Sequence, residues 1–582
     1  MRRVLLIVMI CLLATGQTLA QTDGFLEAVM GLTGITEIED LDEEEYERLA
    51  FLSQHPLDLN HSNQARLISS GLFTAYQAVS LIDYRLRHGD ILSFSELAAL
   101  DGFSESHVKK IMPFISLYVG NIMDISTDRP RNDITVRGGL RNGDEGNRWQ
   151  YGMKYGMQTR SGLSAGLGFS RPNDSEVIWP DLFTASLEYA FDKIPLRLIA
   201  GDHNLRFGQG LALWTGMAMS GLTAPSSLMR RPSGLSPSFT FAGINALTGV
   251  ACSADLKSVT INASLAFPGL RSLNNISFMP SFNVVWNHRF GQIGLTHYLE
   301  TWSEVSDMKT SVDVEWCLRG TDVFGEISFD WKSILPAGLA GVSFPVGDYI
   351  RLGTILRAYP AGYTSSRSGA HRSTTRCSNE FAATFVGEAV SGDRRHQATM
   401  SVDAAYFPEP KANDSDSDGQ LKIKGVWSWT SERISTKVTV NERIRTWGSK
   451  YRTELRADAG MSFSRFTLNM RMDLLHSKDF SVLGYLEGGF RDPDISAYLR
   501  MGIFCVDNWD DRIYVYERDA PGSYNVPAMY GRGLWGSAYA SWKPTRWIRL
   551  YLRASYVSYC LMSEEKKKPG KAELRLQCCM SF

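Results

Sequence analysis

The last nine residues of the chain constrain its fold more than any other segment. From Leu574 to the final Phe582 the sequence reads LRLQCCMSF, so apolar and polar side chains alternate. Because successive side chains of a β-strand point to opposite faces, Leu574, Leu576, Cys578, Met580 and Phe582 share one apolar face. The opposite face is polar. This pattern predicts a strand with one face toward a hydrocarbon or a core and the other toward water.

The same two-residue period recurs through the last 450 residues of the sequence, 133–582. It is clear in 465–474, 495–505 and 548–560, where polar residues such as Arg471 alternate with apolar ones. Segments of about ten residues match the length of a tilted strand that crosses an outer membrane. Strands of a soluble sandwich are more often shorter. We therefore expect 133–582 to form an antiparallel transmembrane β-barrel of roughly 22 to 26 strands, with an even number.

The amino terminus has the three parts of a secretory signal peptide. Arg2 and Arg3 precede an apolar run, 4–13, and small residues end the segment at Ala20. We expect 1–20 to be a cleaved signal peptide. No later apolar run reaches the length of about 18 residues that a transmembrane helix needs.

The final strand resembles the closing strand of bacterial outer-membrane β-barrels. In those proteins a carboxyl-terminal strand ending on an aromatic residue is read by the barrel-assembly machinery. The resemblance implies that Leu574, Leu576, Cys578, Met580 and Phe582 form an assembly signal. It also implies an outer-membrane location, with lipid and the assembly machinery as partners.

Charge divides the chain into two regions. Residues 21–120 contain 16 acidic and six basic residues, a net charge of −10, whereas 121–582 carries +7. Such a split indicates two domains. The run Asp42–Glu45 opens a helical pattern, and acidic residues favour a helix amino terminus. We expect an acidic helical segment over 21–54.

Two copies of a helix–turn–helix pattern follow, each with a glycine in its turn. Gly71 lies in the first turn and Gly102 in the second. The order of helices and turn glycines in the two copies resembles that of the tandem helix-hairpin-helix domain of competence DNA receptors. Combined with a barrel, it is similar to a family of Bacteroidetes outer-membrane proteins of uncertain function. The predicted fold is thus a small all-α domain, 55–118, a linker, 119–132, and the barrel.

In DNA-binding helix-hairpin-helix domains, backbone amides of the hairpin hold a phosphate. The resemblance would place such contacts at Gly71, Leu72, Phe73, Thr74, Gly102, Phe103, Ser104, Lys109 and Lys110. Both hairpins, however, lack the second glycine of the DNA-binding pattern, and 56–115 holds six acidic against five basic residues. Without surplus positive charge, DNA binding is disfavoured. We interpret the domain as a periplasmic module that docks a protein partner, with DNA uptake as the alternative.

A wide barrel needs something to fill its lumen. The segment 216–243 is rich in serine, glycine and proline, and we expect it to fold inward as a plug segment. It follows a glycine-rich stretch that begins at Gly201. Candidate lumen residues are Asp202, His203, Arg206, Arg230 and Arg231, although a purely structural polar cluster is an open alternative.

The sequence gives no support to an enzyme. Its ten histidines are scattered, and neither a nucleophile motif nor a metal-ligand spacing is present, so we expect no cofactor and no metal. The predicted function is a channel or an envelope-assembly component of the outer membrane.

Overall fold

The computed structural model describes residues 24–582 apart from several short segments. These segments are 36, 42, 55, 63, 104, 118–129, 144–145, 160–161, 172–178, 192–193, 217–223, 242–245, 257, 271–275, 289, 303–304, 319, 412–415, 449 and 563–567. The predicted signal peptide, most of the predicted linker and Ser104 therefore lie outside the described residues.

A closed antiparallel barrel of 24 strands forms the wall, which confirms the predicted barrel and its even strand number. The strands are β3 (Arg131–Gly143), β4 (Gly146–Gln158), β5 (Leu163–Arg171), β6 (Leu182–Ala190), β7 (Leu196–Arg206), β9 (Leu247–Leu256), β10 (Val259–Ala266), β11 (Met279–His288), β12 (Gly291–Trp302), β13 (Val305–Leu318), β14 (Thr321–Asp330), β15 (Leu335–Val346), β16 (Ile350–Tyr359), β17 (Glu380–Val390), β18 (His396–Phe407), β19 (Asp418–Thr430), β20 (Ile434–Arg445), β21 (Tyr451–Phe463), β22 (Phe466–His476), β23 (Phe480–Arg491), β24 (Ile495–Val506), β27 (Gly531–Thr545), β28 (Ile548–Ser558) and β29 (Lys571–Ser581). The last strand closes the ring by pairing with the first, β29 with β3.

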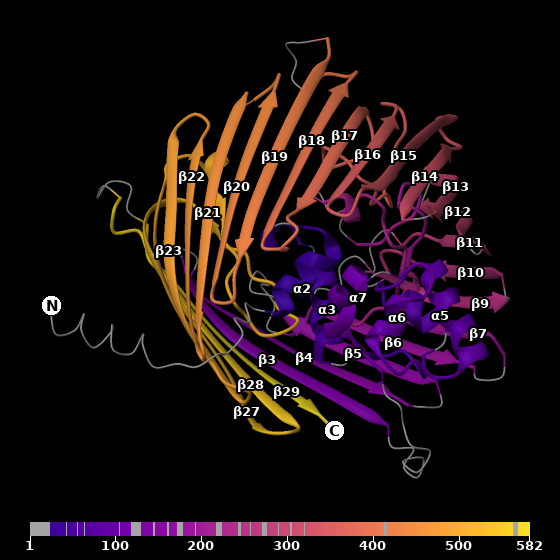
Figure 1. The fold of residues 1–582 in the computed structure, drawn as a ribbon, viewed down its shortest axis with the longest axis horizontal. Helices are drawn as coiled ribbons and strands as arrows, with labels where there is room; N and C mark the ends of the chain where they lie inside the picture. The colour runs from indigo at the N-terminus through magenta and orange to yellow at the C-terminus, as the bar shows by residue number, and fades with distance from the viewer. Residues whose placement is uncertain are drawn as a thin grey trace.

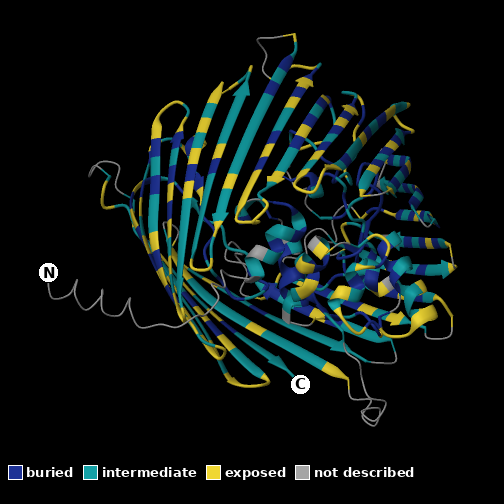
Figure 2. Ribbon diagram, in the orientation of Figure 1, coloured by how far each residue is buried: buried dark blue, intermediate teal, exposed yellow. Residues whose placement is uncertain are grey.

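The outer surface of the wall is apolar and the inner surface polar. In β22 the apolar residues Phe466 and Met470 are exposed on the outside, whereas Arg471 and Asp473 are buried on the inside. The same alternation of exposed and buried residues continues around the ring (Figure 2). An outward apolar face on strands of 8 to 15 residues is the arrangement of a barrel that crosses a lipid bilayer.

Exposed aromatic side chains gather near both ends of the wall. One group lies at the end where β3 begins, and its members are Tyr349, Trp427, Phe466, Trp542 and Trp547. The other lies at the opposite end, with Trp149, Trp331, Tyr406, Tyr451, Phe480 and Tyr556. Such belts mark the two membrane–water interfaces, where amphipathic rings are favoured.

The two ends of the barrel differ in their connections. At the end where β3 begins and β29 finishes, called the seam end here, the strands are joined by turns of two to five residues, such as 464–465 and 391–395. At the opposite end, called the loop end, several connections are much longer.

Three of the long loop-end connections fold back into the lumen. The first inward segment, 207–216 and 224–241, contains η4 (Pro225–Ser227) and β8 (Gly234–Pro237), and β8 pairs with β7 inside the wall. The second is 360–379. The third, 507–530, contains η5 (Trp509–Asp511), β25 (Ile513–Tyr514) and β26 (Ala528–Met529).

The amino-terminal residues 24–116 form a helical unit, called the plug here. Its elements are α2 (Gly24–Thr33), η1 (Ile38–Asp40), α3 (Glu43–Gln54), β1 (Leu57–Asp58), α4 (Gln64–Ser69), α5 (Ala75–His88), α6 (Phe94–Ala98), α7 (Glu105–Ile111), η2 (Met112–Phe114) and β2 (Ile115–Ser116). A hydrophobic core that includes Leu49, Phe73 and Phe114, each fully buried, holds these elements together. Thr74 caps α5 through a reciprocal pair of hydrogen bonds with Gln77.

The plug lies inside the ring of strands (Figure 1). Its contacts reach several parts of the barrel, since α4 packs on β8 and β9, α5 packs on β11 and β12, and Lys154 of β4 binds Glu47 of α3. None of the helices in the described part of the chain is both long and apolar enough to cross a membrane.

Candidate functional site

An ionic seat fixes the plug to the barrel wall. Acidic residues of η1 and α3 face basic residues that point inward from the strands. Glu37 and Asp40 lie 3.7 and 3.2 Å from the Nζ of Lys424 on β19. Acidic plug and basic wall therefore attract each other, as expected from their opposite net charges.

Glu39 is the centre of this seat. One of its carboxylate oxygens lies 3.1 Å from Nη1 of Arg456, and the other binds Nη1 of Arg471. The backbone N–H of Tyr516 donates a third hydrogen bond, at 3.0 Å. Burial alone would raise the pKa of Glu39, but the two guanidinium groups and the amide hold that pKa well below its usual range.

A tyrosine cluster joins the plug to the third inward segment. The hydroxyl groups of Tyr46 and Tyr516 are 3.0 Å apart, and the hydroxyl of Tyr524 donates to the backbone oxygen of Ile38 at 2.6 Å. Tyr516 is also part of the hydrophobic core of the plug. The third inward segment thus packs as an extension of the plug.

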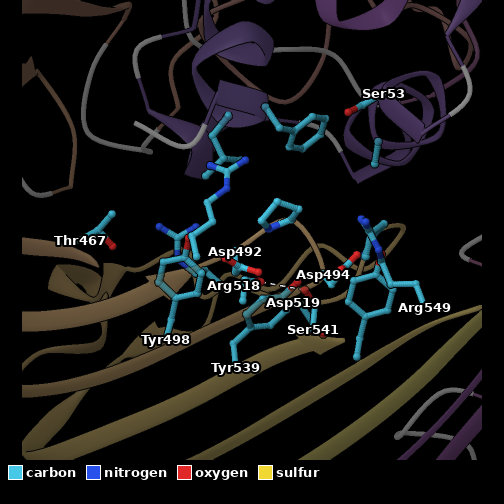
Figure 3. A pocket seen from close by; sticks show the side chains of 18 of the residues that line it. Ser53, Thr467, Asp492, Asp494, Tyr498, Arg518, Asp519, Tyr539, Ser541 and Arg549 are labelled. Atoms are coloured by element: carbon cyan, nitrogen blue, oxygen red, sulfur yellow. Dashed lines mark hydrogen bonds between the residues drawn. The ribbon is translucent and has the colours of Figure 1, made fainter. Parts of the chain in front are cut away.

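A cavity of about 570 Å³ lies between the plug and the wall. Figure 3 shows Ser53 of α3 on one side and Tyr498, Tyr539 and Arg549 of the strands on the other. The seam-end turns 464–465 and 492–494 also line it, so the cavity lies toward the seam end. We call it the seam-end chamber.

Tyrosine, serine and arginine side chains make up most of the lining of the chamber. Arg518 stacks at 4.0 Å over the ring of Tyr498 and donates a hydrogen bond to Glu487 at 3.0 Å. The charged residues of the lining are Arg465, Arg491, Arg518, Arg549, Asp492, Asp494 and Asp519. Flat ring faces beside hydrogen-bond donors and acceptors suit a polar, hydrated solute more than an apolar one.

Asp202 and His203 hold strands together. Asp202 accepts hydrogen bonds from the amide of Ala185 and from the hydroxyl of Thr248. His203 is fully buried, and its Nε2 lies 2.8 Å from the hydroxyl of Ser264. All three partners lie on nearby wall strands, Ala185 on β6, Thr248 on β9 and Ser264 on β10. These contacts favour the alternative that Asp202 and His203 belong to a purely structural polar cluster.

Arg206, Arg230 and Arg231 come together at a second cavity, of about 100 Å³. Plug residues Glu45, Arg48 and Gly71 line its other side. Residues 224–241 of the predicted plug segment 216–243 thus lie in the lumen against the helical plug, while 217–223 and 242–243 lie outside the described residues.

The hairpin residues occupy several environments. Leu72 and Phe73 are fully buried in the plug core, and the ring of Phe103 packs against Phe73 at 6.0 Å. Gly102 accepts a hydrogen bond from Gln77, which ties the two hairpins together.

The lysines and the remaining hairpin residues differ in exposure. Thr74 serves as the cap of α5, and Gly71 is half-buried against Arg48. Lys109 is exposed and bonds Glu105, whereas Lys110 is half-buried, and burial lowers its pKa. The group does not form one continuous exposed surface.

In the closing strand, Leu574, Leu576 and Phe582 are exposed on the outer face, and Cys578 and Met580 are half-buried. Arg575 and Gln577 point inward, toward Asp519 and the backbone oxygen of Pro521 in the third inward segment. One strand therefore contacts both the exterior and the contents of the lumen.

Sequence reasoning missed the wall residues of the seat, Lys154, Lys424, Arg456 and Arg471. Each occupies the polar face of an alternating strand, where a charge is ordinary. The only signal for them was the opposite charge of the two regions of the chain.

No protein-family model matches this chain, and no curated protein matches it in sequence. Among solved structures it is similar to the translocation pore of the P pilus usher PapC, at 8% sequence identity and a TM-score of 0.37, covering 78% of this chain and 99% of that one. It is similar to the copper transporter OprC, at 8% identity, a TM-score of 0.40 and coverage of 77% and 80%. The FrpB iron transporter from Neisseria meningitidis gives 7% identity, a TM-score of 0.38 and coverage of 79% and 82%. These similarities bring no residue of the site with them.

Proposed function

We propose that this protein is an outer-membrane transport barrel whose lumen is closed by its own amino-terminal plug. The observation that carries the proposal is the ionic seat around Glu39. Its contacts are polar and join two separately packed units, the helical core of the plug and the strands of the wall. A polar interface of this kind can separate from the strands without exposing a large apolar surface, with the third inward segment, which shares the plug core through Tyr516, moving together with the plug.

The orientation of the barrel in the membrane follows from its two ends. In outer-membrane barrels short turns face the periplasm and long loops face the exterior. The seam end, and with it the chamber, is accordingly assigned to the periplasm. A solute leaving the lumen would pass the tyrosine and arginine side chains of the chamber, so we expect a polar solute.

The plug itself takes the place of the free docking module expected from sequence. A periplasmic protein partner is still part of the proposal, because a seat of buried ion pairs needs work to open it. DNA uptake has less support, since Leu72 and Phe73 are buried and Lys109 is paired with Glu105.

Reconstitution into planar bilayers tests the proposal. The full chain is expected to give small or intermittent currents, and a variant without residues 24–116 a large steady one. Because that deletion removes many contacts, Glu39→Gln together with Glu47→Gln is the second variant, and Glu105→Gln, on an exposed pair of α7, is its matched control. Equal currents from the full chain, from the deletion variant and from the double variant would contradict a plug.

A further inference from the structure

The cavity of about 100 Å³ is built jointly by the plug and the lumen segments. The plug contributes side chains from α2 and α3 and the turn at Gly71. Facing them are the end of β7, the first inward segment and His371 of the second inward segment. A molecule bound there would contact both units at once.

Positive charge is in excess around this cavity. Arg48, Arg206, Arg230 and Arg231 line it, and the one carboxylate among its lining residues is Glu45. Glu45 is already engaged by Arg48 through both oxygens and lies 3.9 Å from Arg206. The lining thus has four guanidinium groups and one carboxylate, while Asp322 and Glu315 act on Arg231 from beyond it.

Arg230 lacks hydrogen-bond partners for two of its nitrogens. The residue is only 8% exposed, and its Nε and Nη2 atoms are buried without a partner among the described residues. Its guanidinium lies 4.8 Å from the ring centre of Trp214. Burial lowers the pKa of Arg230 to about 10, so the group keeps its charge at neutral pH.

Other hydrogen-bond donors of the same cavity are also buried without a partner among the described residues. They are Nη1 of Arg48 and the hydroxyl groups of Ser226 and Ser233. Burying a charged or polar group without a hydrogen-bond partner is energetically costly. Several such groups around one cavity are best explained by a ligand that accepts hydrogen bonds and carries negative charge.

We propose that this cavity binds a small oxyanion, of the size of inorganic phosphate or a carboxylate. Guanidinium groups present paired N–H donors in the planar geometry that such oxyanions accept. The volume holds several water molecules, enough for an anion of a few atoms. The excess of arginine excludes a cation.

Gly71 fits the same site. Its φ angle is +67°, and a Cβ atom there would lie 2.3 Å from Nη1 of Arg48. The absent side chain leaves room for the guanidinium beside the turn. The turn of the first hairpin thus lies against the guanidinium of Arg48, which α3 contributes to the cavity.

Binding is tested with the full chain in detergent, by thermal unfolding and by isothermal titration with inorganic phosphate at constant ionic strength set with chloride. The expected result is a saturable rise in Tm and one site per chain. Acetate in a parallel series identifies a carboxylate as the ligand chemistry if it gives the saturable shift and phosphate does not. Failure of both anions to bind would overturn the proposal.

Two variants locate the site. Arg230→Met is expected to weaken binding at least tenfold, whereas Arg433→Gln, in an exposed seam-end turn, is expected to bind as the wild type does. Arg230→Met removes an incompletely paired buried charge, so in chloride alone its Tm is expected to equal or exceed that of the wild type. An unchanged phosphate affinity in Arg230→Met would also overturn the proposal. Neither the Tm nor the binding affinity depends on conduction. The proposed anion site is therefore tested separately from the proposed transport function.

Discussion

Glu39 of the plug and Arg471 of β22 form an ion pair between residues 432 positions apart in the chain. Arg471 is itself held by Asp473, two residues further along the strand, to which its Nε and Nη2 atoms donate hydrogen bonds. The wall therefore presents a fixed guanidinium to the plug. This ion pair and the neighbouring contact with Arg456 therefore fix the position of the plug in the lumen.

Replacing Glu39 with glutamine is expected to loosen the plug. Breaking a buried ion pair costs about 3–5 kcal/mol. Because both arginines retain an aspartate partner, we expect the lower end, about 3 kcal/mol, or an increase of roughly a hundredfold in the unseated fraction. Limited proteolysis of the plug in the detergent-solubilised protein measures this fraction. Glu105→Gln should leave the cleavage rate unchanged, and equal rates in both variants would disprove a central role for Glu39.

Acid is expected to unseat the plug. The pKa of Glu39 in the seated form lies below its ordinary value of 4.5, so the seated form binds fewer protons than the unseated form. The stabilisation is therefore complete above about pH 4.5 and is lost as the pH falls below that value. Current measured between pH 6 and pH 3 should increase at the acid end. In Glu39→Gln this acid-dependent increase should be much smaller.

Gly34 is expected to tolerate no side chain. Its φ is +74°, and a Cβ atom would lie 2.7 Å from the Cβ of Ser227 in the first inward segment. Gly89 is a matched control, because its φ is +87° but nothing lies within 4 Å of such a Cβ. Both alanine variants carry a backbone cost of about 1 kcal/mol. We expect a larger loss of Tm in Gly34→Ala than in Gly89→Ala, and the difference measures the contact between the plug and the first inward segment. Equal losses would mean that the first inward segment moves aside at no cost.

A charge on the outer face of the wall is expected to hinder insertion. Met501 lies midway along β24 and is 70% exposed, so Met501→Arg should cost about 2–4 kcal/mol in a bilayer. Leu561, exposed in the loop-end connection 559–570, is the control position for the same substitution. The folded fraction in liposomes as a function of urea gives both values. A penalty of the same size at both positions would argue against a lipid-facing surface on β24.

The wall could be predicted from sequence because its signal is local. In β22 each residue from Phe466 to Asp473 reveals its face by its polarity alone, without knowledge of any partner strand. The helices of the plug were predictable for the same reason, through spacing and turn glycines.

The location of the plug was not predictable in this way. An acidic segment such as Glu37–Asp40 is equally compatible with water and with a basic wall, and the basic residues are hundreds of positions away. The structure places the helical domain in the lumen, where sequence reasoning had suggested a free periplasmic module. The opposite net charges of the two regions indicate an attraction between them. Net charges do not, however, specify which residues form the contacts.

The seam between β29 and β3 has a consequence for biogenesis. Asn132 and Phe582 exchange backbone hydrogen bonds at 2.8 and 2.9 Å, so the ring cannot close before the last strand is present. The plug precedes every strand of the wall in the chain and ends up enclosed by them. The helices therefore have to enter the lumen either before the β29–β3 hydrogen-bond ladder closes the ring or through one end of the barrel afterwards.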